Sequence, residues 1–192
     1  MNTVRKLKLQ VQLSIDGFVA GPHGKMDWLT FNWDEEIGRC VQAITDPVDC
    51  IVLGRKLAEG FIPHWAAVAA DAEHPEFAAG QKFSETPKVV FTRTLDRSEW
   101  PNAVLARGDL VEEINRLKSQ AGGDIIAYGG AAFVSGLVQH DLIDEYNLFV
   151  NPAALGTGMP IFTALPSPRR FVLETAIAFP CGIVLIRHRR AN

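Results

Sequence analysis

Residues 124–144 read D-I-I-A-Y-G-G-A-A-F-V-S-G-L-V-Q-H-D-L-I-D, in which a strand pattern, a glycine pair and a helix pattern follow one another directly. The apolar run 125–128 predicts a short strand buried on both faces. Gly129 and Gly130 interrupt it, and 131–139 continues with helical spacing. Such a turn leaves backbone N–H groups free, and these groups and the helix dipole favour an anion such as a phosphate. The alternative is an ordinary tight turn that binds nothing, because the full G-x-G-x-x-G fingerprint is absent.

Two other strand patterns end in glycine or in cations. The apolar run 50–53 stops at Gly54-Arg55-Lys56, and the run 87–92 ends at Thr92-Arg93-Thr94. In parallel α/β sheets, ligands bind beyond the carboxyl ends of the strands. If these strands are neighbours, their ends converge on one crevice with a helix N-terminus and two cationic turns. The sequence therefore indicates a site for a nucleotide that carries several phosphates, and a phosphorylated ribose would account for the extra arginine.

Strand and helix patterns alternate along the chain. Further strands are expected at 7–13, 104–105 and 145–150, and an antiparallel pair is expected at 171–176 and 183–188. Helices are expected after Asp34, after the capping-box residue Asp109 and at 131–139, while 59–83 suggests a short helix, a loop and another helical piece. The whole chain, 1–192, therefore reads as a single α/β domain. It has a predominantly parallel central sheet flanked by helices and an antiparallel C-terminal hairpin.

Composition excludes several classes of function. The chain has 192 residues and a net charge of −3, which argues against a nucleic-acid partner, because such a partner needs a basic face. No apolar run approaches the ~18 residues of a membrane span, and the N-terminus enters alternating sequence rather than a signal peptide. Three separated cysteines and five isolated histidines form no metal-site spacing. We therefore expect a soluble cytoplasmic protein without a metal ion.

The aromatic stretch 27–33 and the glycine-rich loop 14–24 are the candidates for contact with a substrate. Trp28 and Trp33 suggest the wall of a pocket, and an edge of the core is an equally good interpretation. The loop folds over a ligand or is a surface connection. Asp34 precedes the following helix, and capping that helix is the simplest interpretation of this residue.

Several motifs in order resemble those of dihydrofolate reductase-like proteins. They are L-S-I-D-G-F-V-A at 13–20, L-G-R-K at 53–56, V-V-F-T-R at 89–93, A-Y-G-G at 127–130, L-I-D-E-Y at 142–146 and L-G-T-G-M-P-I-F at 155–162. The branch that the chain resembles most is the reductase (C-terminal) domain of the bifunctional riboflavin-biosynthesis deaminase-reductase. The resemblance covers nearly the whole chain.

This resemblance implies an NADPH-dependent reductase that acts on a small molecule as a homodimer. Gln12 would lie beside the nicotinamide, and a cis peptide would join the glycine pair. The implied cofactor-binding residues are Gln12, Gly54, Arg55, Lys56, Thr92, Arg93, Gly129, Gly130, Ala131, Ala132 and Phe133.

The chain also departs from the family pattern. Leu57 stands where many relatives have a hydroxyl residue. True dihydrofolate reductases carry an acid near the start of the first helix; its position corresponds either to Asp34 or, by the spacing from Trp28, to Trp33. The closest substrate analogy is 5-amino-6-(5-phosphoribosylamino)uracil, and another heterocycle or a carbonyl compound is also possible. Two different functions stay open beside this one: a nucleotide-binding protein without catalysis, and a true dihydrofolate reductase.

Overall fold

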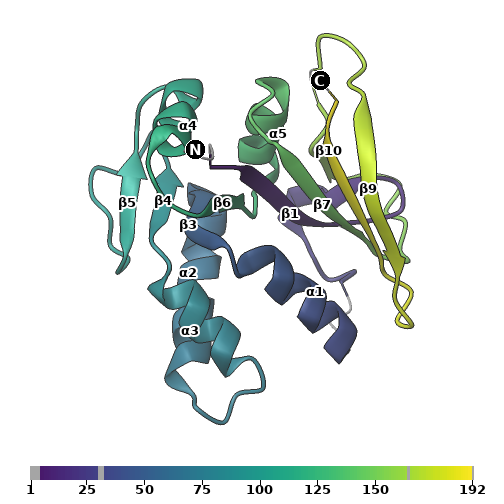
Figure 1. Ribbon diagram of the computed structural model, residues 1–192, viewed down its shortest axis with the longest axis horizontal. Coiled ribbons are helices and arrows are strands. Elements are labelled where there is room, and N and C mark those ends of the chain that lie inside the picture. Colours follow the sequence, from purple (N-terminus) through teal and green to yellow (C-terminus); the bar gives the residue numbers. More distant parts are fainter. Residues whose placement is uncertain (1–4, 30–32, 164, 192) are drawn as a thin grey trace.

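The computed structural model describes residues 5–29, 33–163 and 165–191, and one eight-stranded sheet runs through them (Figure 1). The strand order is β5-β4-β3-β6-β1-β7-β10-β9. The strands are β1 Leu7–Leu13, β3 Val48–Gly54, β4 Lys88–Phe91, β5 Ala103–Ala106, β6 Asp124–Ala127, β7 Glu145–Val150, β9 Phe171–Ala178 and β10 Val184–Arg190. Those from β5 to β7 pair in parallel, and β10 is antiparallel to both β7 and β9. The expected α/β class, parallel core and antiparallel C-terminal hairpin are confirmed.

Two helical layers cover this sheet. The helices are α1 Glu35–Thr45, α2 Arg55–Ala70, α3 Phe77–Glu85, α4 Leu110–Ser119 and α5 Ala131–Gln139, with a short 3-10 turn, η1, at Pro22–Gly24. Side chains of α4 and α5 share one buried cluster with the sheet, and side chains of α1, α2 and α3 share the other. Figure 1 shows the two groups of helices on opposite sides of the strands.

The side chains of β1 show how its sequence divides between these layers. Leu7, Leu9, Val11 and Leu13 belong to the cluster under α4 and α5. Because successive residues of a strand point to opposite faces, Lys8, Gln10 and Gln12 face the side of α1 to α3. The alternating sequence of β1 thus places a row of polar side chains beneath the second helical layer.

The element boundaries differ from expectation at α2, in the C-terminal hairpin and in the loop 14–24. Helix α2 begins at Arg55, directly after β3, and continues for 16 residues with Pro63 inside it, so it is longer than the short helix expected within 59–83. The C-terminal hairpin extends beyond the expected 171–176 and 183–188, since β9 ends at Ala178 and β10 at Arg190. The loop 14–24 contains β2 (Phe18–Ala20), which pairs with β8 (Met159–Pro160).

None of the described helices is long and apolar enough to span a membrane.

Candidate functional site

The three strand ends singled out in the sequence lie side by side. Strands β4, β3 and β6 are consecutive in the sheet and parallel, so their carboxyl ends share one edge. The turns after β3 and β6 are in direct contact, because the Gly54 N–H donates to the Gly129 carbonyl at 3.0 Å. Gly129 and Gly130 are joined by a cis peptide, as expected. This edge of the sheet is the candidate functional site.

Helices α2 and α5 begin at this edge with free backbone N–H groups. Their N-cap residues are Gly54 and Gly130, which have no side chain to accept those hydrogen bonds. By contrast, α1 and α4 are capped by Asp34 and Asp109, whose carboxylates accept two backbone N–H bonds each. Two open helix N-termini at one edge favour an anion with more than one phosphate group.

Close packing requires glycine at position 54. A Cβ at Gly54 would lie 2.9 Å from the Cβ of Phe133 and 3.6 Å from the Gly130 nitrogen. Phe133 packs in turn against Phe91 of β4, with 4.9 Å between the ring centroids. The first turn of α5, which also includes Ala131 and the exposed Ala132, therefore approaches the backbone of the β3–α2 turn directly.

The residues that follow β4 and β5 add positive charge at the outer end of this edge. Thr92 is 8% exposed, and its Oγ1 accepts from the Thr94 and Leu95 N–H groups at 3.1 and 3.2 Å. This turn leaves Arg93 exposed, and no ion pair of Arg93 occurs among the residues that the structure describes. Arg107 follows β5 and pairs with Asp96 at 3.1 Å.

Arg107 is a candidate that the sequence analysis missed. The signal was available, because Arg107 directly follows the run that pairs with β4. At the start of α2, Arg55 pairs with Glu59 one turn later, while Lys56 is exposed.

Aromatic side chains line the next part of the edge, toward β1 and β7. Phe149 pairs in register with Gln12, and the Trp33 ring stacks on it with centroids 6.2 Å apart. Tyr128, directly after β6, stacks on Phe61 of α2 at 5.2 Å. Burial raises the pKa of the Tyr128 hydroxyl, which has no hydrogen-bond partner within the described chain. Gln12 is half-buried beside Phe149.

The other residues named from the sequence take less central places. Trp28 is half-buried in the segment after η1. Leu57 Cδ2 would lie 3.5 Å from a Cβ at Gly129, so Leu57 packs beside the glycine pair. Asp34 Oδ1 accepts from the Glu36 and Ile37 N–H groups at 3.0 and 2.9 Å, which confirms it as the cap of α1.

The glycine-rich loop is fastened beside this edge. The Asp16 carboxylate accepts from the N–H groups of Leu155 and Gly156, and Ile15 N–H donates to the Ala153 carbonyl at 2.7 Å. The Ser14 hydroxyl, and then those two backbone groups, lower the pKa of Asp16. The loop after β1 and the loop after β7 therefore form one unit.

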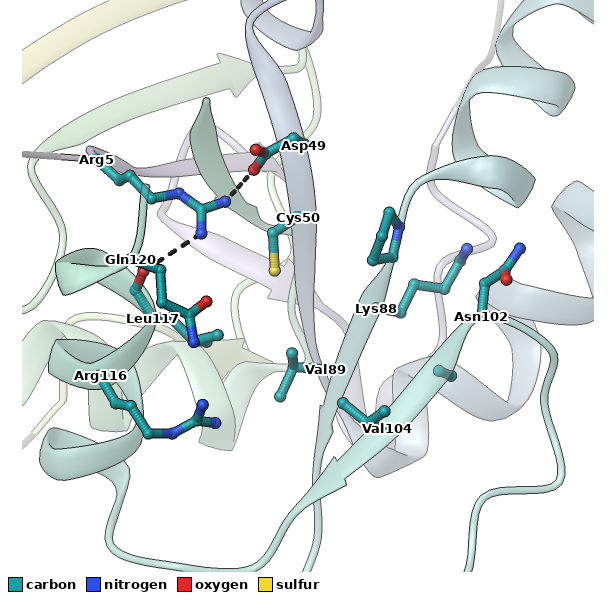
Figure 2. A pocket seen from close by; sticks show the side chains of 12 residues that line it. Arg5, Asp49, Cys50, Lys88, Val89, Asn102, Val104, Arg116, Leu117 and Gln120 are labelled. Carbon is teal, nitrogen blue, oxygen red and sulfur yellow. Dashed lines mark hydrogen bonds and ion pairs between the residues drawn. The ribbon is translucent and has the colours of Figure 1, made fainter. Parts of the chain in front are cut away.

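A hollow of about 640 Å³ lies at the amino ends of β3, β4 and β5, away from the candidate site at their carboxyl ends (Figure 2). Cys50, Val89 and Val104 reach it from the strands, and Leu117 reaches it from α4. Arg5 beside it donates to Asp49, to the Leu117 carbonyl at 3.3 Å and to the Gly123 carbonyl at 2.6 Å. Because Arg5 is committed to protein groups and the strand-end motifs lie elsewhere, we place the functional site at the carboxyl edge.

The strand order and its helical layers define a dihydrofolate reductase-like fold. More particularly, the chain belongs to the RibD C-terminal domain family, whose model matches residues 5–185. This membership places it among reductase-like domains.

Solved structures show the same fold. A putative riboflavin biosynthesis protein from Shewanella sp. PV-4 is 22% identical with a TM-score of 0.72, and the match covers 97% of this chain and 99% of that one. A diaminohydroxyphosphoribosylaminopyrimidine deaminase/5-amino-6-(5-phosphoribosylamino)uracil reductase from Thermotoga maritima is 20% identical with a TM-score of 0.69. That match covers 97% of this chain and 57% of the other. An Enterococcus faecalis dihydrofolate reductase complexed with NADP(H) is 13% identical with a TM-score of 0.63, and the match covers 97% of each chain.

Proposed function

We propose that the protein is an NADPH-dependent reductase that resembles the 5-amino-6-(5-phosphoribosylamino)uracil reductase domain of riboflavin biosynthesis. The observation that carries this proposal is the meeting of three strand ends, two open helix N-termini and exposed cations at one edge. When bound, the cofactor would supply a hydride to an electrophilic carbon of a heterocyclic or carbonyl substrate. The protein would contribute positioning and the exclusion of water.

The residues at this edge fit a dinucleotide that carries an extra phosphate. Gly54, Gly129 and Gly130 would hold the pyrophosphate with the first turns of α2 and α5, because residues without a side chain let a phosphate approach the uncapped N–H groups of those turns. Thr92, Arg93 and Arg107 would face the adenosine 2′-phosphate, while Arg55 and Lys56 would add charge beside the β3–α2 turn.

Gln12 would lie beside the nicotinamide, with Trp28 and Trp33 toward the substrate. Asp34 remains the candidate proton donor, with a bound water or the substrate itself as the other sources. We further propose that the enzyme is a cytoplasmic homodimer.

A comparison of NADPH with NADH tests the cofactor assignment. NADPH is expected to raise the melting temperature more than NADH, because only NADPH carries the 2′-phosphate. Arg93→Ala should erase this difference. Arg97→Ala, which removes an exposed cation in the same loop, should keep it. Equal shifts for both cofactors with the parent protein would refute the assignment.

Turnover is tested separately by the loss of NADPH absorbance with pterin, uracil and carbonyl compounds. Oxidation of NADPH with any of these supports a reductase. Binding of NADPH without turnover across the panel would favour a nucleotide-binding protein without catalysis.

A further inference from the structure

Asn151 is a buried amide at the point where β7 ends. It is 3% exposed, and its Nδ2 lies 2.8 Å from Gln12 Oε1, 3.0 Å from the Phe149 carbonyl and 3.4 Å from the Leu13 carbonyl. Two of these three neighbours are backbone carbonyls, which only accept hydrogen bonds. The amide group of Asn151 must therefore point its nitrogen toward them, since the reverse orientation would bring three oxygens together.

This orientation fixes the carboxamide of Gln12 as well. Asn151 presents a donor to Gln12, so Gln12 must present Oε1 to Asn151. The Gln12 Nε2 group, with two N–H donors, is then turned away from β7. No acceptor for Nε2 occurs within the described part of the chain, and Gln12 is only half-buried. A donor of fixed direction is thus left accessible at the carboxyl end of β1.

The surroundings of this donor are aromatic. Gln12 is in register with Phe149, on which Trp33 stacks. On its other side β1 pairs with β6, which continues into Tyr128 and the glycine pair. A ligand that lies against the exposed part of Gln12 would meet one directed amide donor at the carboxyl end of β1. An amide donor in such a setting selects a ligand with a carbonyl oxygen at its edge.

We propose that Asn151 is a positioning residue that holds Gln12 Nε2 toward the carboxamide oxygen of the nicotinamide. This inference rests on the proposed function, because it takes the nicotinamide ring to lie at the end of β1. It assigns to Asn151 a role in recognising the reactive half of the cofactor, although Asn151 itself does not touch the ligand.

Binding of NADP⁺ is compared with binding of adenosine 2′,5′-bisphosphate, which has the adenosine end of the cofactor and no nicotinamide. Gln12→Leu removes the donor, and Asn151→Ala frees Gln12 to rotate. Each change should weaken NADP⁺ binding about three- to tenfold, which is typical of one lost hydrogen bond, and should leave bisphosphate binding within about twofold. The double variant should be no weaker than Gln12→Leu alone, because both changes remove the same contact.

Asn147→Ala is the matched control. Asn147 is also a buried amide on β7, and its Nδ2 also donates to a β1 carbonyl, that of Leu9, at 3.4 Å. Its loss should lower the melting temperature and leave the ratio of the two affinities unchanged. If Asn151→Ala does not fold, Asn151→Asp replaces it: the carboxylate only accepts hydrogen bonds, so it should turn Gln12 Nε2 inward and weaken NADP⁺ binding in the same way.

The possible failures are distinct. If the parent protein binds neither ligand, the proposed function fails and this inference fails with it. If the parent protein binds both ligands and the Gln12 and Asn151 variants leave their ratio unchanged, the inference alone is overturned. An Asn151→Ala effect no larger than that of Asn147→Ala, or additive with Gln12→Leu, also overturns it.

Discussion

The Asp34 carboxylate caps the N-terminus of α1. Capping and proton donation can therefore be tested separately at this residue. Asparagine caps a helix about as well as aspartate, whereas alanine has no acceptor. We expect Asp34→Ala to lower the free energy of unfolding by about 1 kcal/mol and Asp34→Asn to change it by less than about 0.5 kcal/mol. Chemical denaturation measures both values.

The pH–rate profile of Asp34→Asn then addresses the chemistry. This variant keeps the cap and loses the acid, so a lost acidic limb in the profile would assign the proton to Asp34. An unchanged profile would assign the proton to water or to the substrate, and it would leave Asp34 with capping alone.

Cys50 on β3 shows what burial does to a titrating group. It is 6% exposed, and burial raises the pKa of its thiol to about 11. The thiolate is the reactive form, so at about pH 8 a chromogenic disulfide reagent should modify the half-buried Cys40 and Cys181 and spare Cys50 until the protein unfolds. Cys50→Ala should leave the number of thiols that react in the native protein unchanged and reduce the number that react in the unfolded protein by one. Equal reactivity of all three native thiols would contradict this expectation.

The same shift sets a sign for stability. The folded-state pKa of Cys50 lies above the ordinary value of 9.0, so the protonated thiol favours the folded state below about pH 9. This contribution declines as the pH rises toward about 11. Cys50→Ala should therefore show a smaller loss of stability over that interval than the parent protein.

At the scale of elements, α2 and α3 pack together through a glycine. A Cβ at Gly80 would lie 2.7 Å from Val68 Cγ1 and 2.8 Å from the Ala69 nitrogen. Gly80→Ala must therefore separate the helices, and we expect it to cost about 2 kcal/mol of stability. Gly60→Ala on α2 is the control, because its added Cβ would meet no described atom within 4 Å apart from its chain neighbours and the backbone of its own helix.

Gly60→Ala should stabilise the protein by about 0.5–1 kcal/mol, through the higher helix propensity of alanine. Urea unfolding of the two variants should give changes of opposite sign. Equal stability of Gly80→Ala and Gly60→Ala would show that the helices do not touch at Gly80.

Elements with strong local signals were predictable from the sequence. The bounds of β1 and α5 agree with expectation, because alternation in one and a glycine turn before the other are local patterns. The pairing of β2 with β8 was not predictable, since it joins segments far apart in the chain and each strand is very short. The extent of α2 was not predictable, because its first turn coincides with the strand end Gly54-Arg55-Lys56 and Pro63 lies inside it, whereas packing of Ala58, Ile62 and Val68 holds the helix together.

The candidate site was also predictable from the sequence only in part. The glycine and cation motifs at the strand ends are contiguous in sequence, so they were visible before the fold was known. Their convergence required the order β4-β3-β6, which no single motif specifies. The contact between Gln12 and Asn151 joins residues 139 positions apart, and neither residue belongs to a motif of its own.

At the scale of the whole molecule, the two outermost strands of the sheet differ. Strand β5 forms one edge with four residues, and β9 forms the other with eight, of which six are apolar. Leu173 of β9 is 56% exposed. A long, apolar edge strand with unpaired backbone groups is a ready surface for another strand. A two-fold axis would pair two copies of β9 in antiparallel fashion, and such an interface is complementary to itself. The homodimer proposed above would therefore form through β9.

We therefore expect the protein to have twice the chain mass of 21.1 kDa in light scattering. Leu173→Glu should give the monomer, because it places like charges near the two-fold axis. Val104→Glu is the matched control: Val104 is 62% exposed on β5, and the change should leave the mass unchanged. A parent protein of single chain mass would refute the homodimer. A dimer that survives Leu173→Glu and is lost in Val104→Glu would move the interface to β5.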